Sequence, residues 1–106
     1  RQPPGIAKAD QVFALYVVGD SMSPRYDPGD LVYIHKSRPP AIGGDVVVEM
    51  HLEAEGQPSR AMIKRLVRRG ATVELRQFNP PKTIKLPAQQ VKQVLRILTN
   101  AEIMGV

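Results

Sequence analysis

The stretch Val12–Pro24, VFALYVVGDSMSP, carries the strongest structural signal of this chain. Its first part, Val12–Val18, is apolar, aromatic and β-branched with no glycine or proline, which predicts a strand. A glycine, an acid, two hydroxyl residues and a proline then predict a sharp turn. Such a turn would expose the Ser21 hydroxyl beside backbone N–H groups able to bind an oxyanion. The alternative is a polar turn in which Ser21 bonds its own backbone.

The composition is that of one soluble globular domain. The 106 residues suffice for one modest core and are too few for two domains. Hydrophobic residues make up 42% and charged residues 24%, a balance typical of globular proteins. The chain has no cysteine, which excludes disulfides and thiol nucleophiles and agrees with a reducing, cytoplasmic location. No apolar run approaches the roughly 18 residues of a membrane span, so no membrane association is expected.

The basic charge alone does not predict a nucleic-acid interface. The net charge is +5, from 15 basic and 10 acidic residues, which permits binding to nucleic acid. The densest basic stretch consists of Lys64, Arg65, Arg68 and Arg69. No helix-turn-helix pattern, zinc-finger spacing or aromatic–basic motif accompanies it. We therefore expect this segment not to read DNA directly.

The rest of the chain alternates apolar runs with turn residues, which predicts a mostly β fold of seven to nine short strands with little helix. Residues 90–98 also fit a helical pattern, but their β-branched content favours a strand. Residues 1–10 are polar and predict an arm or linker stub before a domain at 11–106. Residues 53–60 predict a polar hairpin loop. Besides the first strand, the predicted strands are 31–36, 45–52, 61–69, 72–77, 83–86, 90–98 and 103–106.

Two Gly-Asp pairs stand at the start of predicted strands. The stretch Asp27–Asp30 (DPGD) fits a type II turn, because proline takes the second position and glycine supplies the positive φ at the third. Asp45 likewise follows a glycine at a strand start. Turn chemistry accounts for both Asp30 and Asp45 in this interpretation.

A lysine later in the chain offers Ser21 a base. Hydrolysis of an amide by serine needs a base, and a lysine serves when burial keeps its amine neutral. In the predicted strand 61–69, Lys64 shares a face with Met62 and Leu66. Apolar residues also lie on the other face, so the pattern leaves open which face is buried. The alternative is a lysine whose stem packs while its amine reaches solvent.

Histidine provides weaker constellations. His35 and Asp30 would complete a triad with Ser21, but no spacing relates the three residues. His35 and His51 lack a close third ligand, so no metal site is predicted. No cofactor is predicted either.

Four blocks together resemble the LexA-like Ser–Lys peptidase domain. This is the C-terminal domain of LexA, of phage repressors of the CI type and of UmuD-like proteins. The order and spacing of the blocks hold from Val12 to about Leu75, with a looser match to the end. The blocks are Gly19–Pro24 (GDSMSP), Asp27–Val32 (DPGDLV), Gly44–Val48 (GDVVV) and Ile63–Leu66 (IKRL).

The resemblance implies a curved, largely antiparallel β fold shared with the catalytic core of signal peptidase. It implies that Ser21 is the nucleophile and Lys64 the general base. It also implies that the backbone N–H groups of Asp20 and Ser21 form the oxyanion hole. Met22 would pack beneath the nucleophile as a support residue.

The resemblance further implies self-cleavage and dimerisation. In this family a segment N-terminal to the domain enters its own active site and is cut at a small-residue bond, commonly Ala-Gly or Cys-Gly. An activated recombinase filament promotes the cut during the SOS response to DNA damage, and the domain forms homodimers. Neither dipeptide occurs in this chain, so the scissile bond and a DNA-binding domain are expected in a missing N-terminal part. A self-cleaving transcriptional repressor is thus implied. The alternatives are a dimerisation module without working self-cleavage and a UmuD-like accessory subunit of an error-prone polymerase.

Overall fold

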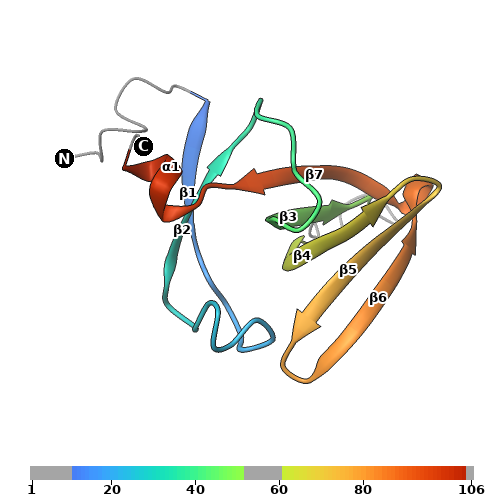
Figure 1. Cartoon of the computed structure of the whole chain (residues 1–106), viewed down its shortest axis with the longest axis horizontal. Helices are drawn as coiled ribbons and strands as arrows, with labels where there is room; N and C mark the ends of the chain where they lie inside the picture. Colours follow the sequence, from blue (N-terminus) through green and yellow to red (C-terminus); the bar gives the residue numbers. More distant parts are fainter. Residues whose placement is uncertain (1–10, 52–60, 105–106) are drawn as a thin grey trace.

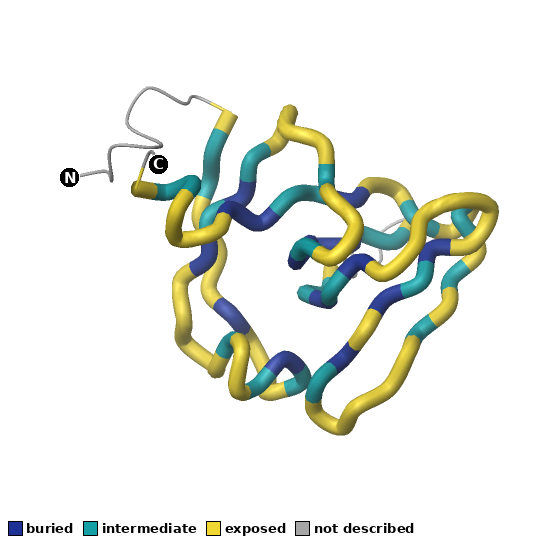
Figure 2. The backbone as a smooth tube through the Cα atoms, viewed as in Figure 1, coloured by how far each residue is buried: buried dark blue, intermediate teal, exposed yellow. Residues whose placement is uncertain are grey.

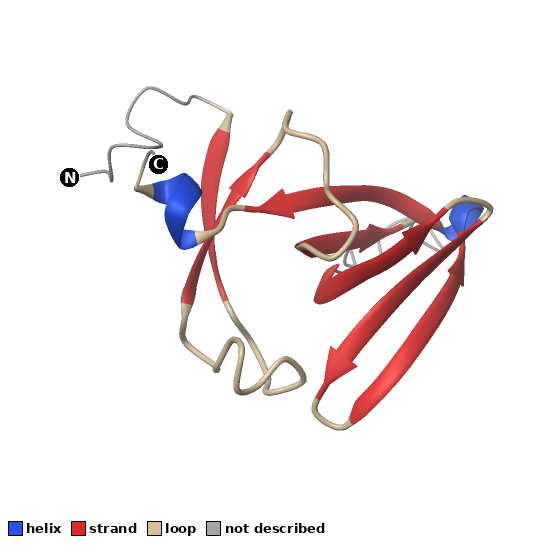
Figure 3. Ribbon diagram, viewed as in Figure 1, coloured by secondary structure: helices blue, strands red, loops and turns tan. Residues whose placement is uncertain are grey.

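A computed structural model describes residues 11–51 and 61–104 and confirms a mostly β fold (Figures 1 and 3). The predicted arm at 1–10 and the predicted loop at 53–60 lie outside these ranges. None of the helices in the described ranges has the length and apolar character that a membrane crossing requires. The strands are β1 Val12–Tyr16, β2 Leu31–His35, β3 Asp45–Met50, β4 Ala61–Arg69, β5 Thr72–Phe78, β6 Pro81–Pro87 and β7 Val91–Ile97. A 3-10 helix, η1, covers Ala88–Gln90, and a short helix, α1, covers Asn100–Ile103.

All seven strands form one antiparallel sheet in the order β1-β2-β7-β3-β4-β5-β6. Although β7 comes last in the chain, it lies between β2 and β3 and so joins the first hairpin to the β3–β6 meander. The β2–β7 pairing has only two residue pairs, Ile34–Ile97 and His35–Arg96. Figure 1 shows β1, β2 and α1 on one side of a strongly bent sheet and β3 to β6 on the other.

The central strand β3 contributes to two apolar clusters, one on each of its faces. Val46 and Val48 pack with Leu66 in the first cluster. Val47 points to the opposite face and packs with Ile34 in the second. Because both faces are covered, the first four residues of β3 are all buried, as Figure 2 shows for the middle of the sheet. This double burial explains the unbroken apolar run in β3.

Several strand boundaries differ from the prediction by a few residues. The ambiguous range 90–98 forms β7, so the strand interpretation is confirmed. The first strand ends at Tyr16 rather than at Val18. The last strand of the meander is longer than predicted, because β6 begins at Pro81 and pairs with β5 over seven residue pairs. Pairing across the sheet, rather than local propensity, sets these limits.

The strand predicted at 103–106 is wrong where the structure describes it. Thr99 caps α1: its side chain accepts a hydrogen bond from the Glu102 N–H, and the Glu102 carboxylate accepts one from the Thr99 N–H. Arg38 and Arg96 also donate to that carboxylate, at 2.8 and 2.7 Å. These bonds outweigh the strand propensity of Ile103.

Candidate active site

Ser21 lies in the connection between β1 and β2. The connection includes Gly19, whose φ of 80° lies in the left-handed region that residues other than glycine rarely adopt. Tyr26 N–H donates to the Met22 carbonyl at 3.0 Å and closes a turn that begins directly after the serine. The Met22 side chain is buried, with 2% of its surface exposed. The loop is thus anchored directly after Ser21.

Residues at the turn between β5 and β6 donate hydrogen bonds to two carbonyl groups of the Ser21 loop. The N–H groups of Phe78 and Asn79 donate to the Ser21 carbonyl at 3.1 and 2.8 Å. Asn79 Nδ2 also donates to the Asp20 carbonyl at 3.1 Å. In Figure 1 the two connections lie side by side. The Asp20 carbonyl and the Ser21 N–H belong to the same trans peptide and point in opposite directions, so the Ser21 N–H points away from the Asn79 side chain.

Lys64 reaches Ser21 from β4. Its Nζ donates to Ser21 Oγ at 3.0 Å and to the Ile63 carbonyl at 3.1 Å. Lys64 is 5% exposed and shares the buried face of β4 with Leu66, which answers the question that the sequence pattern left open. Burial lowers the pKa of Lys64 below its ordinary value of 10.5, and the positive charge of Lys82 lowers it further. The amine therefore becomes neutral more readily than a lysine in water.

A cleft of about 250 Å³ opens beside Ser21 and Lys64. Its walls are mostly apolar and come from β1, from the residues that follow β1, and from β3 and β4. Two apolar residues of this wall, Tyr16 and Val18, are 71% and 93% exposed. Strand β1 lies at an edge of the sheet, and a sheet edge offers backbone groups to an added strand. The cleft can therefore receive an extended, apolar segment of polypeptide.

The histidine alternative has no support in the contacts. His35 Nδ1 accepts hydrogen bonds from the N–H groups of Ser37 and Arg38, at 3.2 and 3.0 Å. These bonds close the end of β2. Ser21 is bonded by Lys64 instead, so the structure brings together the serine and the lysine that the sequence singled out.

The two Gly-Asp aspartates have different roles. Asp30 belongs to the predicted turn: its N–H donates to the Asp27 carbonyl at 3.0 Å, its carboxylate accepts from the Asp27 N–H at 2.8 Å, and Gly29 has a φ of 91°. The turn interpretation of Asp45 is wrong. Its side chain is 4% exposed and bonds residues distant in sequence. The available signal is its position directly before the apolar run Val46–Val48, where a carboxylate needs partners.

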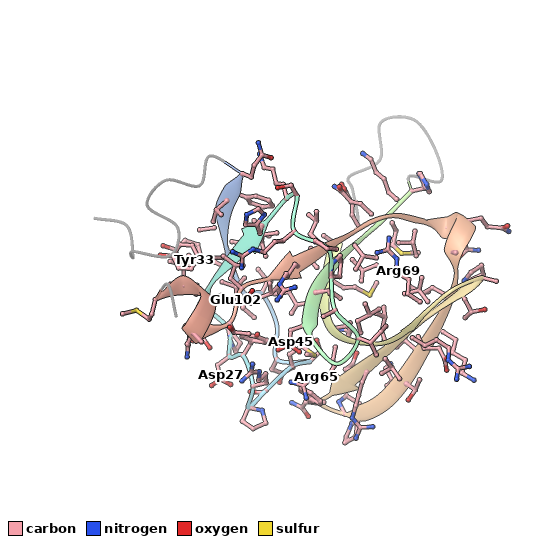
Figure 4. The ribbon with its side chains drawn as sticks, turned by 45° about the horizontal axis from the view of Figure 1, so that its top comes forward. Asp27, Tyr33, Asp45, Arg65, Arg69 and Glu102 are labelled. Atoms are coloured by element: carbon pink, nitrogen blue, oxygen red, sulfur yellow. The ribbon has the colours of Figure 1, made fainter. Side chains whose placement is uncertain are left out.

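Three donors converge on the Asp45 carboxylate. Oδ2 accepts from Arg25 Nε at 3.0 Å and from the Tyr26 hydroxyl at 2.8 Å, while Oδ1 accepts from Arg65 Nε at 3.1 Å. Figure 4 shows Asp45 and Arg65 next to each other. Burial and the bond to Asp45 raise the pKa of Tyr26 to about 12, so its hydroxyl remains a donor. The bond to Asp45 also raises the pKa of Arg25.

A bent antiparallel sheet with a loop serine bonded by a buried lysine defines a peptidase-like class of domain. Residues 2–105 match the Peptidase S24-like family, and the chain belongs to this family. The resemblance to LexA-like domains is therefore confirmed.

Two curated relatives are repressors. The chain is 37% identical over 99 residues to Repressor protein C of Rhizobium phage 16-3, covering 91% of this chain and 38% of that protein. It is 34% identical over 71 residues to Prophage repressor CohE of Escherichia coli strain K12, covering 67% of this chain and 30% of that protein. The chain thus spans less than two fifths of the length of either relative. No solved structure gave a significant match.

Proposed function

We propose that residues 11–106 are the self-cleaving domain of a phage-type transcriptional repressor, with Ser21 as nucleophile and Lys64 as general base. One observation carries this proposal: the 3.0 Å contact between Lys64 Nζ and Ser21 Oγ at the wall of an apolar cleft. At this distance a proton passes directly between the two groups. The lowered pKa of Lys64 supports the role of base, because only the neutral amine accepts a proton.

The first chemical step follows from these contacts. Neutral Lys64 keeps one N–H on the Ile63 carbonyl and turns its lone pair toward the Ser21 hydroxyl. It takes the hydroxyl proton as Oγ attacks the scissile carbonyl. The N–H groups of Asp20 and Ser21 then stabilise the negative oxygen. Lys64 returns the proton to the leaving amine, and water hydrolyses the acyl-enzyme. Buried Met22 supports the loop from beneath.

The proposed substrate is an extended segment of the same polypeptide that lies N-terminal to this domain. The apolar walls of the cleft and the position of β1 at the edge of the described sheet support a strand-like substrate. DNA binding is assigned to a further domain, and an activated recombinase filament is the proposed inducer. The repressor names of both relatives favour this function over a polymerase accessory subunit.

The test uses the full-length gene product that contains this segment. Incubation at about pH 10, near the ordinary lysine pKa, should produce two fragments faster than incubation at neutral pH. Ser21→Ala and Lys64→Ala should each abolish the cut, as measured by fragment masses. The matched control is Lys85→Ala, which removes a lysine that is 68% exposed and pairs with Glu74. Circular dichroism checks that each variant folds.

Retained cleavage in either dyad variant would contradict the assignment. An intact wild-type chain at alkaline pH would favour the second candidate, a dimerisation module whose serine and lysine are not used. A rate that does not change between neutral and alkaline pH would exclude lysine as the base.

A further inference from the structure

A single buried carboxylate joins the two segments that carry Ser21 and Lys64. The Asp45 oxygens are divided between them: Oδ2 binds Arg25 and Tyr26, which follow Ser21 in the loop, and Oδ1 binds Arg65, which follows Lys64 in β4. Asp45 itself begins β3, where it pairs with Arg65 across the sheet. The carboxylate therefore spans the gap between the loop and β4.

Arg65 also connects Asp45 to the turn between β5 and β6. Its guanidinium lies 5.0 Å from the centre of the Phe78 ring, and the Phe78 N–H donates to the Ser21 carbonyl. Arg65 thus contacts both the carboxylate and the turn that holds the serine. A continuous series of contacts runs from Ser21 through Phe78, Arg65 and Asp45 back to the loop at Tyr26.

We propose that Asp45 is a positioning residue that holds the loop of Ser21 at a fixed distance from Lys64. The inference rests on the proposed function, since that distance matters only if the two groups react. Within the described residues, the hydrogen bonds between residues 19–30 and β3 or β4 all end on Asp45, apart from the Ser21–Lys64 bond itself. A buried carboxylate with three donors is a rigid link, because losing one partner leaves polar groups buried and unpaired.

The test weakens the bonds from the loop to Asp45 without changing the charge. In the double variant Arg25→Lys/Tyr26→Phe, Asp45 loses the planar guanidinium and the hydroxyl, while the net charge is preserved. The matched control is Arg38→Lys/Tyr33→Phe. The side chain of Arg38 is 47% exposed, compared with 49% for that of Arg25. Arg38 pairs with Glu102 instead of Asp45. Lys82, the charged group of β6 whose field lowers the Lys64 pKa, is the same in both variants.

Two readouts separate positioning from stability. The first is the Lys64 pKa, measured by an NMR titration of its Cε signal and assigned with Lys64→Ala. We expect it to rise toward 10.5 in the Arg25/Tyr26 variant, because a looser loop admits water, and to stay unchanged in the control. The second is phosphonylation of Ser21 by a fluorophosphonate, followed by intact mass. It should slow about tenfold at neutral pH, with its pH profile displaced upward.

The outcomes distinguish this inference from the proposed function. A Lys64 pKa and a labelling profile equal to those of the control, in a variant with a lower melting temperature, would overturn the positioning role. A raised Lys64 pKa with an unreactive wild-type serine would retain the positioning role and reject hydrolysis. If the double variant does not fold, Tyr26→Phe alone removes one hydroxyl from Asp45 and is measured in the same way.

Discussion

At the scale of single residues, Lys64 is the side chain with the most unusual surroundings. It is 5% exposed and shares its strand face with Leu66, so its charged form loses hydration that the neutral form hardly needs. The Ser21 hydroxyl and the Ile63 carbonyl compensate for only part of this loss. We infer that the same burial that prepares the amine as a base also reduces the stability of the fold at neutral pH.

Replacing this lysine by an apolar side chain tests that inference. The pKa of Lys64 is lower in the folded chain than in the unfolded chain, so the unfolded chain binds more protons between the lowered pKa and 10.5. The free energy of unfolding of the wild type should therefore rise, relative to Lys64→Met, as the pH increases through this window. Urea unfolding of both proteins at a series of pH values measures the difference. A difference independent of pH would show that the amine is not desolvated.

At the scale of elements, the β1–β2 connection depends on glycine at Gly19 and Gly29. Their φ values are 80° and 91°. A Cβ at Gly29 would meet no atom within 4 Å, so space does not explain the residue. The left-handed backbone does.

Alanine substitution at two glycines separates conformation from contact. Gly29→Ala should lower the free energy of unfolding by about 1 kcal/mol, because alanine is strained at a φ of 91°. Gly70, in the β4–β5 turn, is equally uncrowded but not left-handed. There, alanine should be neutral or stabilise the chain by up to about 1 kcal/mol. Equal effects of the two substitutions in urea unfolding would refute this explanation.

At the scale of the whole molecule, several large apolar side chains remain exposed on the described surface. Leu31, Ile42 and Met104 are 45%, 61% and 60% exposed, and they do not line the cleft beside Ser21. Such side chains mark an interface only where they form one contiguous patch. We propose, from the resemblance to LexA-like domains, that this domain forms homodimers.

Sedimentation equilibrium of the segment tests the homodimer. The expected result is an average mass that rises from monomer to dimer as the concentration increases through about the micromolar range. The Ser21→Ala variant should behave identically, since association does not depend on the hydroxyl. A monomer at every concentration would contradict dimerisation through this domain and leave the self-cleavage proposal unaffected.

The sequence by itself determined most of the strands and the Asp27–Asp30 turn, while the pairing of Ser21 with Lys64 came from the resemblance to LexA-like domains. Strands follow from local alternation and β-branched content, and the turn follows from the fixed φ of proline and the freedom of glycine. The helix at 100–103 has a local signature, Thr99 followed three residues later by Glu102, which the strand interpretation of 103–106 overlooked. Only the bonds from Arg38 and Arg96 to Glu102 depend on the fold. Local sequence patterns therefore predict the features that depend only on residues close together in the chain.

Only the tertiary structure decided which face of β4 is buried, where β7 inserts and what Asp45 binds. In the bent sheet β7 lies between β2 and β3, and β3 is covered on both faces. The decisive contacts join residues 43 positions apart for Ser21 and Lys64 and 20 apart for Arg25 and Asp45. A buried charge takes whichever donor the fold brings within reach, and that depends on how the whole sheet curves rather than on the residues beside it in the chain.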